Sequence, residues 1–216
     1  MSEMTSTRLL CPTCIRLLSG SGFPVLLNPT PTGFPITFAV ADYADAVRAI
    51  VLTYKERGGR ALASPLGIAL ANAVAAGCVM AGYDFDQPGS GIGLVPVPST
   101  RAATRRRAYD AVGSIALVAA AQLRRRGILA RRLTILRQRR TVMDQSELSA
   151  AARMRNLAGA LTVPAQFTSL TVGSAIIVVD DLVTTGATLT EAARAVREAT
   201  GVVATAGVVA VTPRRC

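Results

Sequence analysis

The residues best suited to chemistry lie in one run near the end of the chain, where an apolar stretch is followed by two acids and a threonine-rich turn. Ala175 to Val179 are five consecutive apolar residues, which predict a buried strand, and Asp180 and Asp181 follow them directly. Open α/β sheets bind ligands at the carboxyl ends of their strands. The two carboxylates could there accept hydrogen bonds from vicinal sugar hydroxyls or hold Mg²⁺ through water.

The turn after the acids has the composition of a cup for one phosphate group. It comprises Thr184, Thr185, Gly186, Ala187 and Thr188, and it leads directly into a predicted helix. The start of a helix offers free backbone N–H groups and the positive end of its dipole. The glycine permits close approach of the backbone, and the threonine hydroxyls add donors. Strand, acids and cup together predict a site for a phosphorylated sugar.

Other phosphate-binding motifs fit this turn less well. It lacks the Gly-Lys-Ser/Thr ending of a Walker A loop, and Gly89, Gly91 and Gly93 precede a predicted strand rather than opening a helix. The plainest alternative is a strand that ends in two solvated acids and a threonine helix cap. That alternative requires the acidic pair, the spacing and the Thr-Thr-Gly-x-Thr turn to coincide by chance.

The net charge of +11 is concentrated in one segment. From Ser99 to Arg140 the sequence contains twelve arginines and one acid, Asp110, so the rest of the chain sums to zero. Such an excess favours a polyanionic partner: a nucleic acid, a membrane surface or a small molecule. Of the 24 basic residues 23 are arginine, a bias that the codons of a GC-rich genome also produce. The sequence has no histidine, so carboxylates, the substrate or water must supply any acid–base chemistry.

The elements that must position these residues alternate between helix and strand from Ile92 onward. The alternation predicts an α/β domain with a mostly parallel sheet covered by helices on both faces, and 216 residues suit one such domain. A small N-terminal appendage precedes it and is expected to be irregular from Ser19 to Pro35. Apolar periodicity predicts helices at 42–57, 60–80, 109–126, 147–157 and 187–199, and strands at 92–97, 133–136, 175–179 and 202–211.

Composition also bears on the compartment. Every apolar run is interrupted by Gly, Pro or a charge well short of the roughly 18 residues of a membrane span. Residues Met1–Arg8 contain no export signal. The four cysteines have irregular spacings and are expected to be reduced thiols: Cys11, Cys14, Cys78 and Cys216. These features predict a cytoplasmic protein without a membrane span.

Val178–Leu189 resembles the phosphoribosyl-pyrophosphate (PRPP) motif of type I phosphoribosyltransferases. Three further stretches resemble the ComF/GntX-like (competence protein ComF) branch of that superfamily. Tyr43–Lys55 is similar to its first helix, which ends in a lysine. The other two are similar to its Pro-Val-Pro and Arg-Gly-Phe-Asn-Gln segment and to its Gln…Leu…Arg…Asn segment: Val95–Pro98 with Arg101, Arg105, Arg107 and Tyr109, and Asp144, Gln145, Leu148, Arg153 and Asn156. The resemblance covers about residues 36–212.

The resemblance implies the type I phosphoribosyltransferase fold, with a hood related to a degenerate zinc ribbon at 1–35 and the phosphoribosyltransferase domain at 36–216. It implies Mg²⁺-dependent transfer of the phosphoribosyl group from PRPP to a nitrogenous base or amine, with release of pyrophosphate. Asp180 and Asp181 would hold the ribose hydroxyls, and Thr184–Thr188 would bind the 5′-phosphate. The pyrophosphate would be bound by Ser99, Thr100, Arg101, Arg105 and Arg107. A mobile loop would contain or adjoin Arg137, Arg139, Arg140 and Gln145.

The chain departs from the family pattern in two places. Cys11-Pro-Thr-Cys14 supplies one half of a four-cysteine zinc ribbon and no second pair follows, so a four-ligand zinc site within one chain is not expected, and Cys11 and Cys14 are weak zinc candidates that would need ligands shared across a dimer. The Arg-Gly-Phe-Asn-Gln segment reads Arg107-Ala-Tyr-Asp-Ala111. Losing the glycine removes freedom for an unusual backbone geometry, and Asp110 adds a negative charge close to the expected pyrophosphate. These changes bear on turnover and on the choice of substrate.

Two other functions remain open at this point. The first is a non-catalytic protein of the same fold that senses PRPP or a nucleotide. The second is a competence-related accessory factor whose basic segment follows a DNA backbone. Against DNA binding, the sequence has no tryptophan and the basic segment contains one aromatic residue, Tyr109, so stacking platforms are missing. A homodimer is compatible with the resemblance, which does not identify the nitrogenous acceptor.

Overall fold

The central feature of the fold is a mostly parallel sheet. The computed structural model describes residues 9–85, 91–99, 101–140, 150–167, 174–202 and 205–213. Within them the sheet has seven strands in the order β1-β2-β9-β8-β4-β5, with β3 also paired to β9, and β1 alone runs antiparallel. The strands are β1 (Phe23–Pro24), β2 (Thr37–Ala39), β3 (Ala41–Asp42), β4 (Gly91–Pro96), β5 (Ala130–Arg132), β8 (Ser174–Val183) and β9 (Thr205–Val211).

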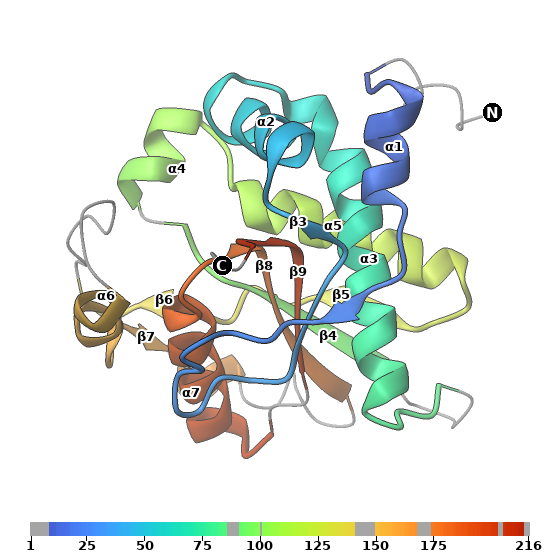
Figure 1. Cartoon of the computed structure of the whole chain (residues 1–216). Coiled ribbons are helices and arrows are strands. Elements are labelled where there is room, and N and C mark those ends of the chain that lie inside the picture. The colour runs from blue at the N-terminus through green and yellow to red at the C-terminus, as the bar shows by residue number, and fades with distance from the viewer. Residues whose placement is uncertain are drawn as a thin grey trace.

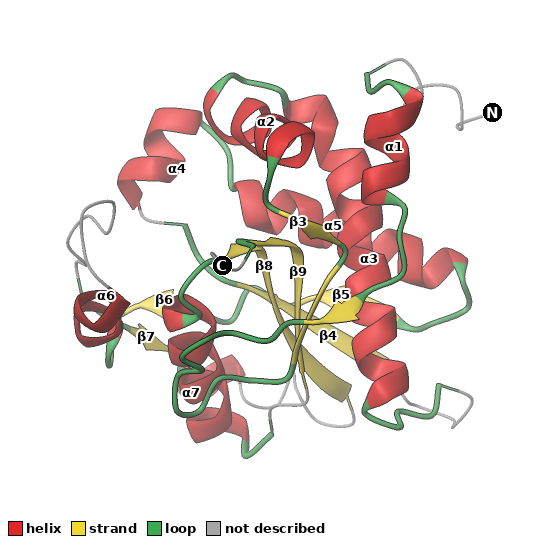
Figure 2. Ribbon diagram, viewed as in Figure 1, coloured by secondary structure: helices red, strands yellow, loops and turns green. Residues whose placement is uncertain are grey.

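Helices cover both faces of this sheet (Figures 1 and 2). The helices are α1 (Pro12–Leu18), α2 (Asp45–Glu56), α3 (Ala63–Met80), α4 (Arg101–Arg107), α5 (Ala111–Arg125), α6 (Ala150–Leu157) and α7 (Ala187–Thr200), with a 3-10 turn, η1, at Arg60–Leu62. One core lies between the sheet and α2, α3 and α5, and a second core lies between the sheet and α7. A separate two-stranded sheet, β6 (Arg137–Gln138) with β7 (Leu161–Thr162), belongs to the α7 side.

The side chains of β8 point alternately to the two faces of the sheet, so this one strand contributes to both cores. Ala175, Ile177 and Val179 pack into the core of α2, α3 and α5, whereas Ile176 and Val178 pack into the core of α7. All five are nearly inaccessible to solvent. A strand buried on both faces requires an unbroken apolar run, which is the pattern that predicted it.

The strand order places a topological switch point between β4 and β8. From β4 the chain continues through α4 and α5 to β5 on one side, and from β8 it continues through α7 to β9 on the other side. Neighbouring strands whose connections leave in opposite directions form a topological switch point, where open α/β sheets bind ligands at the carboxyl ends. The predicted α/β class with a mostly parallel sheet flanked by helices is therefore confirmed.

Most predicted elements agree with the structure within a few residues, but four differences stand out. The strand expected at 133–136 is absent: β5 occupies 130–132, and Leu133, Ile135 and Leu136 are buried as loop residues against the α7 side. Helix α4 was not among the predicted helices, and β8 continues to Val183, so both acids lie inside the strand. The appendage contains α1 and β1, so the stretch from Ser19 to Pro35 is irregular only in part.

One helical stretch is long and apolar enough to cross a membrane by length and composition alone. It spans Arg60–Met80 with a mean hydropathy of 1.7. The stretch is the helix predicted at 60–80, and Pro65 lies in the first turn of α3, where proline is tolerated. A share of 61% of the apolar window is buried inside the protein, where α3 packs against α5 and β9. Such burial is typical of a core helix.

Candidate functional site

The strongest candidate site lies at the carboxyl ends of β4 and β8. The two strands are paired in parallel up to Pro96 and Val179, and the Val97 N–H donates to the Val179 carbonyl at 2.9 Å. The residues that follow each strand therefore meet at one edge of the sheet: Ser99 after β4, and the acids with the threonine turn in and after β8. We call this set the acidic-pair site: Lys55, Ser99, Arg107, Asp180, Asp181 and Thr184–Thr188.

The two acids point in different directions because they are consecutive residues of an extended strand. Asp181 points to the face of α2, where its side chain is only 3% exposed and its Oδ2 lies 2.5 Å from Nζ of Lys55. Asp180 lies on the opposite face and is partly exposed. Its Oδ1 accepts a hydrogen bond from the backbone N–H of Asp181 at 2.9 Å. The acids thus present one paired and one less engaged carboxylate.

The electrostatics of the pair follow from burial and proximity. Burial raises the pKa of Asp180 well above its usual range, and the neighbouring charge of Asp181 raises it further. For Lys55, burial alone would lower the pKa of the ammonium, but the carboxylates of Asp181 and Asp180 outweigh burial and raise it. Lys55 is therefore a fixed positive charge, and Asp180 is a carboxyl whose ionised form is costly.

The sequence analysis did not assign Lys55 to the site. The residue lies in the last turn of α2, 126 positions before Asp181, so their contact is a product of the fold. A signal for it existed, because Lys55 is the only lysine in a sequence whose other 23 basic residues are arginine. The resemblance of 43–55 to a family helix ending in lysine pointed to the same residue.

The threonine turn places a glycine with positive φ at the N-terminus of α7. Gly186 has a φ of +78° and is the N-cap of α7, and its carbonyl accepts the first helical hydrogen bond, from Thr190, at 2.9 Å. A Cβ at this position would lie 2.7 Å from Leu27 and 2.9 Å from Phe34 of the N-terminal segment. The predicted cup is thus closed on one side by that segment, whose trace crosses α7 in Figure 1.

Helix α4 places the arginines that were predicted to bind pyrophosphate in different environments. Arg105 is exposed, whereas the Arg107 side chain is only 11% exposed and contacts Glu56 at 3.5 Å. Its Nε is buried and has no hydrogen-bond partner within the described residues. Ser99 is partly buried after β4. Arg101 begins α4, its side chain is not described, and Thr100 lies outside the described residues.

Two of the residues that depart from the family pattern, Ala108 and Asp110, have structural roles. Ala108 has a φ of +59°, the left-handed region that glycine adopts without strain, so the unusual backbone geometry persists although the glycine does not. Asp110 is the N-cap of α5 and accepts a hydrogen bond from the Gly113 N–H at 3.1 Å. Asp110 therefore has a structural role as the cap of α5.

Beside Ala108, two tyrosines connect α2 to the start of α5. The Tyr109 hydroxyl donates to the Tyr54 carbonyl, their rings meet edge to face at 5.6 Å, and the Arg60 guanidinium lies 5.1 Å from the Tyr109 ring. Tyr54 in turn donates to the Ala111 carbonyl at 2.7 Å. Burial raises the pKa of the Tyr54 hydroxyl, so it stays protonated and acts as a strut.

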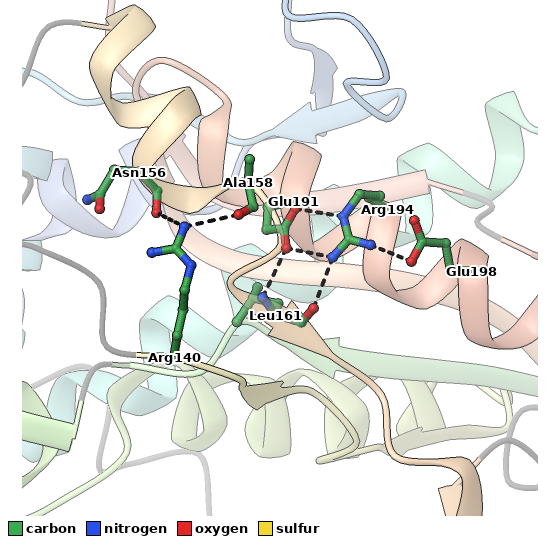
Figure 3. Close-up of polar contacts among 7 residues, drawn as sticks. All are labelled: Arg140, Asn156, Ala158, Leu161, Glu191, Arg194 and Glu198. Carbon is green, nitrogen blue, oxygen red and sulfur yellow. Dashed lines mark hydrogen bonds and ion pairs between the residues drawn. The ribbon is translucent and has the colours of Figure 1, made fainter.

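Two of the arginines expected in or beside a mobile loop, Arg137 and Arg140, make local contacts with neighbouring loops and helix ends. Arg137 donates to the carbonyls of Thr134 and Leu136 and lies 5.3 Å from the Phe167 ring. Arg140 donates to the Asn156 and Ala158 carbonyls at 2.7 and 3.0 Å, which stabilises the carboxyl end of α6 (Figure 3). Arg139 is exposed. The segment 141–149, with Asp144, Gln145 and Leu148, lies outside the described residues.

A second polar cluster, on α7, was missed by sequence reasoning. Glu191 is 95% buried and accepts hydrogen bonds from the Leu161 N–H at 2.9 Å and from Arg194 at 2.7 and 2.8 Å (Figure 3). Arg194 also donates to the Leu161 carbonyl and pairs with Glu198. Burial alone would raise the pKa of Glu191, but its bonds from Arg194 and Leu161 lower it. We call these four residues the α7 network.

Many of the arginines that make up the charge excess form local hydrogen bonds or ion pairs. Arg124 donates to the Ala130 carbonyl, Arg126 to Asn72 and Arg132 to the Gly113 carbonyl. Arg106 pairs with Glu56 at 2.9 Å. Many arginines of the basic segment thus brace loops and helix ends, and Arg107 is the one placed beside the acidic pair with an unpaired buried donor among the described residues.

The cysteine pair forms the start of α1. Cys11 is the N-cap and its sulfur accepts a hydrogen bond from the Cys14 N–H at 3.5 Å, which lowers the pKa of the Cys11 thiol. Within the described residues no three His, Cys, Asp or Glu side chains gather to hold a metal ion. Cys78 is buried in α3, where burial raises the pKa of its thiol to about 11, and Cys216 lies outside the described residues.

Comparison with known proteins adds no relative. No family model matches the chain, and no curated protein matches it.

Proposed function

We propose that this protein has a type I phosphoribosyltransferase-like fold, binds PRPP together with Mg²⁺, and transfers the phosphoribosyl group to a nitrogenous base or amine. The observation that supports this most is the convergence at the β4/β8 edge. An acidic pair, a serine-containing strand end and a Thr-Thr-Gly-Ala-Thr turn at a helix N-terminus lie there together. Each corresponds to a stretch whose sequence resembles the family.

The chemistry that this arrangement suits is displacement of pyrophosphate at the anomeric carbon. The carboxylates of Asp180 and Asp181 would stabilise the positive charge that develops on the ribose ring and would accept its hydroxyl protons in hydrogen bonds. The turn at Gly186 would hold the 5′-phosphate through backbone N–H groups. Arg107 would donate to the leaving pyrophosphate. The nitrogen nucleophile comes from the acceptor, so the lack of histidine is no obstacle.

The donors also suit the metal that accompanies PRPP. Mg²⁺ prefers carboxylate and water oxygens, and Asp180 would supply the oxygens of a partly exposed carboxylate. Bound with PRPP, Mg²⁺ would neutralise charge on the leaving pyrophosphate.

The direct test is calorimetry of PRPP binding with and without Mg²⁺. Micromolar, Mg²⁺-dependent binding supports the proposal, and a screen of bases and amines for pyrophosphate release then tests transfer. Arg48→Gln, an exposed change on α2, is a control that should leave binding unchanged. Binding without release for any acceptor would favour a sensor. No binding at millimolar PRPP would overturn the proposal and direct the basic segment to a salt-dependent DNA-binding assay.

A further inference from the structure

Lys55 is exceptional in this sequence because it is the only lysine among 24 basic residues. A bias toward arginine explains the other 23 and makes the exception informative. Arginine is a broad planar fork, whereas lysine is a compact charge on a flexible stem whose three protons can be turned toward different acceptors. Lysine at this one position therefore indicates that the cationic group there must be compact and must be able to reorient toward different acceptors.

Two cations, Lys55 and Arg107, act on one another here, among the carboxylates of Asp180, Asp181 and Glu56. The Lys55 ammonium contacts the buried Asp181 at 2.5 Å and is 76% buried itself. The positive charge of Arg107 acts on it unfavourably, as like charges do at short range. Arg107 has a buried Nε without a hydrogen-bond partner in the described part of the chain, and its contact with Glu56 is long, at 3.5 Å. Two adjacent cations with spare donors form a site for a polyanion.

We propose that Lys55 exchanges partners when a ligand binds: its ammonium leaves Asp181 and donates to an oxygen of the ligand's pyrophosphate, beside Arg107. Asp181 is thereby released to accept a hydrogen bond from a ribose hydroxyl. This inference rests on the proposed function and identifies Lys55 as the partner that Asp181 has before the ligand binds. The contact between Lys55 and Asp181 keeps a buried carboxylate neutralised until the sugar replaces the ammonium.

The exchange predicts opposite effects of one substitution on two probes. Asp181→Asn removes the acid that competes for Lys55, so inorganic pyrophosphate should bind several-fold more tightly. The same variant should bind PRPP about tenfold or more weakly, because the carboxylate that accepts from ribose is lost. An unchanged or weaker affinity for pyrophosphate in Asp181→Asn overturns the exchange.

Removing the Lys55 ammonium provides the second test of the exchange. Lys55→Met should weaken both pyrophosphate and PRPP by about tenfold or more, whereas Arg48→Met, which removes an exposed charge from the same helix, should change neither. Lys55→Met leaves Asp181 buried without its cation and can unfold the protein. The double variant Lys55→Met with Asp181→Asn removes both charges and serves in its place. If the double variant binds pyrophosphate as well as Asp181→Asn does, Lys55 does not touch the ligand and the exchange is wrong.

A single lysine also permits direct observation. Labelling with ¹⁵N-lysine gives one side-chain ammonium signal, that of Lys55, and it should move on addition of pyrophosphate and of PRPP with Mg²⁺. A signal that stays in place while calorimetry records PRPP binding overturns the exchange and leaves the proposed function standing. A signal that moves with pyrophosphate while PRPP gives no heat overturns the proposed function and supports Lys55 as a polyphosphate ligand.

Discussion

The acidic-pair site and the α7 network contain the same kinds of group and differ in how completely those groups are paired. In the α7 network Glu191 accepts three hydrogen bonds, and the Arg194 guanidinium donates to Glu191, Glu198 and the Leu161 carbonyl. In the acidic-pair site Asp180 is costly to ionise, and Arg107 has an unsatisfied buried nitrogen within the described residues. Charged groups whose hydrogen bonds are all satisfied within the protein stabilise a fold, whereas charged groups with unsatisfied hydrogen bonds and perturbed pKa values are candidates for ligand binding.

The largest effect should follow from breaking the α7 network. Glu191→Ala leaves the Leu161 N–H without its acceptor and Arg194 without its main partner. We expect the free energy of unfolding to fall by about 2–3 kcal/mol, less than a fully buried pair would lose because Arg194 is partly exposed. Urea denaturation measures this change. Glu198→Ala, at the exposed end of the network, should lose roughly 0.5 kcal/mol or less, and an equal loss would refute the contrast between the two acids.

The two regions should also respond to pH with opposite signs. The pKa of Asp180 is raised in the folded state, so its ionisation destabilises the fold as pH rises above the usual carboxyl range of about 4. The pKa of Glu191 is lowered, so its stabilisation is present above that range and is lost as pH falls through the folded-state pKa. Asp180→Asn should therefore be more stable than the parent at neutral pH, and Glu191→Gln less stable, with both differences shrinking toward pH 3.

Denaturation curves across pH 3–8 test these signs. The exposed Asp42 provides the control, since Asp42→Asn should follow the parent curve throughout. Asp180→Asn should at the same time bind PRPP more weakly, so stability is gained where binding is lost. A parent-like pH profile for Asp180→Asn would contradict the raised pKa.

The smallest effect concerns backbone strain beside the acidic-pair site. Ala108 occupies a left-handed conformation, so Ala108→Gly should raise the free energy of unfolding by about 1 kcal/mol. Ala49, an exposed residue inside α2, is the matched control: Ala49→Gly should lose about 1 kcal/mol. Thermal unfolding of the two variants should shift in opposite directions. A loss in both would mean that Ala108 is not strained.

Local patterns allowed part of this molecule to be predicted. The apolar run 175–179 and the glycine turn before α7 were predictable because both depend on neighbouring residues. Helix α4 was missed because its Arg, Ala and Thr residues have no apolar periodicity, and 133–136 was misassigned because apolar loop residues resemble a short buried strand. The pairing of Lys55 with Asp181 could not be predicted, since it depends on how α2 packs over β8.

The position of β2 has a consequence for the order in which the protein forms during synthesis. β2 joins the sheet through β9, the last strand of the chain, and Leu27 and Phe34 cover a turn that lies about 150 residues downstream. At roughly 5–20 residues per second, the ribosome needs on the order of 10–30 s to supply those partners. During that interval α3 is present to pack against β2, but Leu27 and Phe34 lack the turn that they cover in the folded protein. We therefore expect nascent chains that lack β9 to depend on chaperones, and chains truncated before residue 205 to leave β2 and β3 unpaired with the sheet.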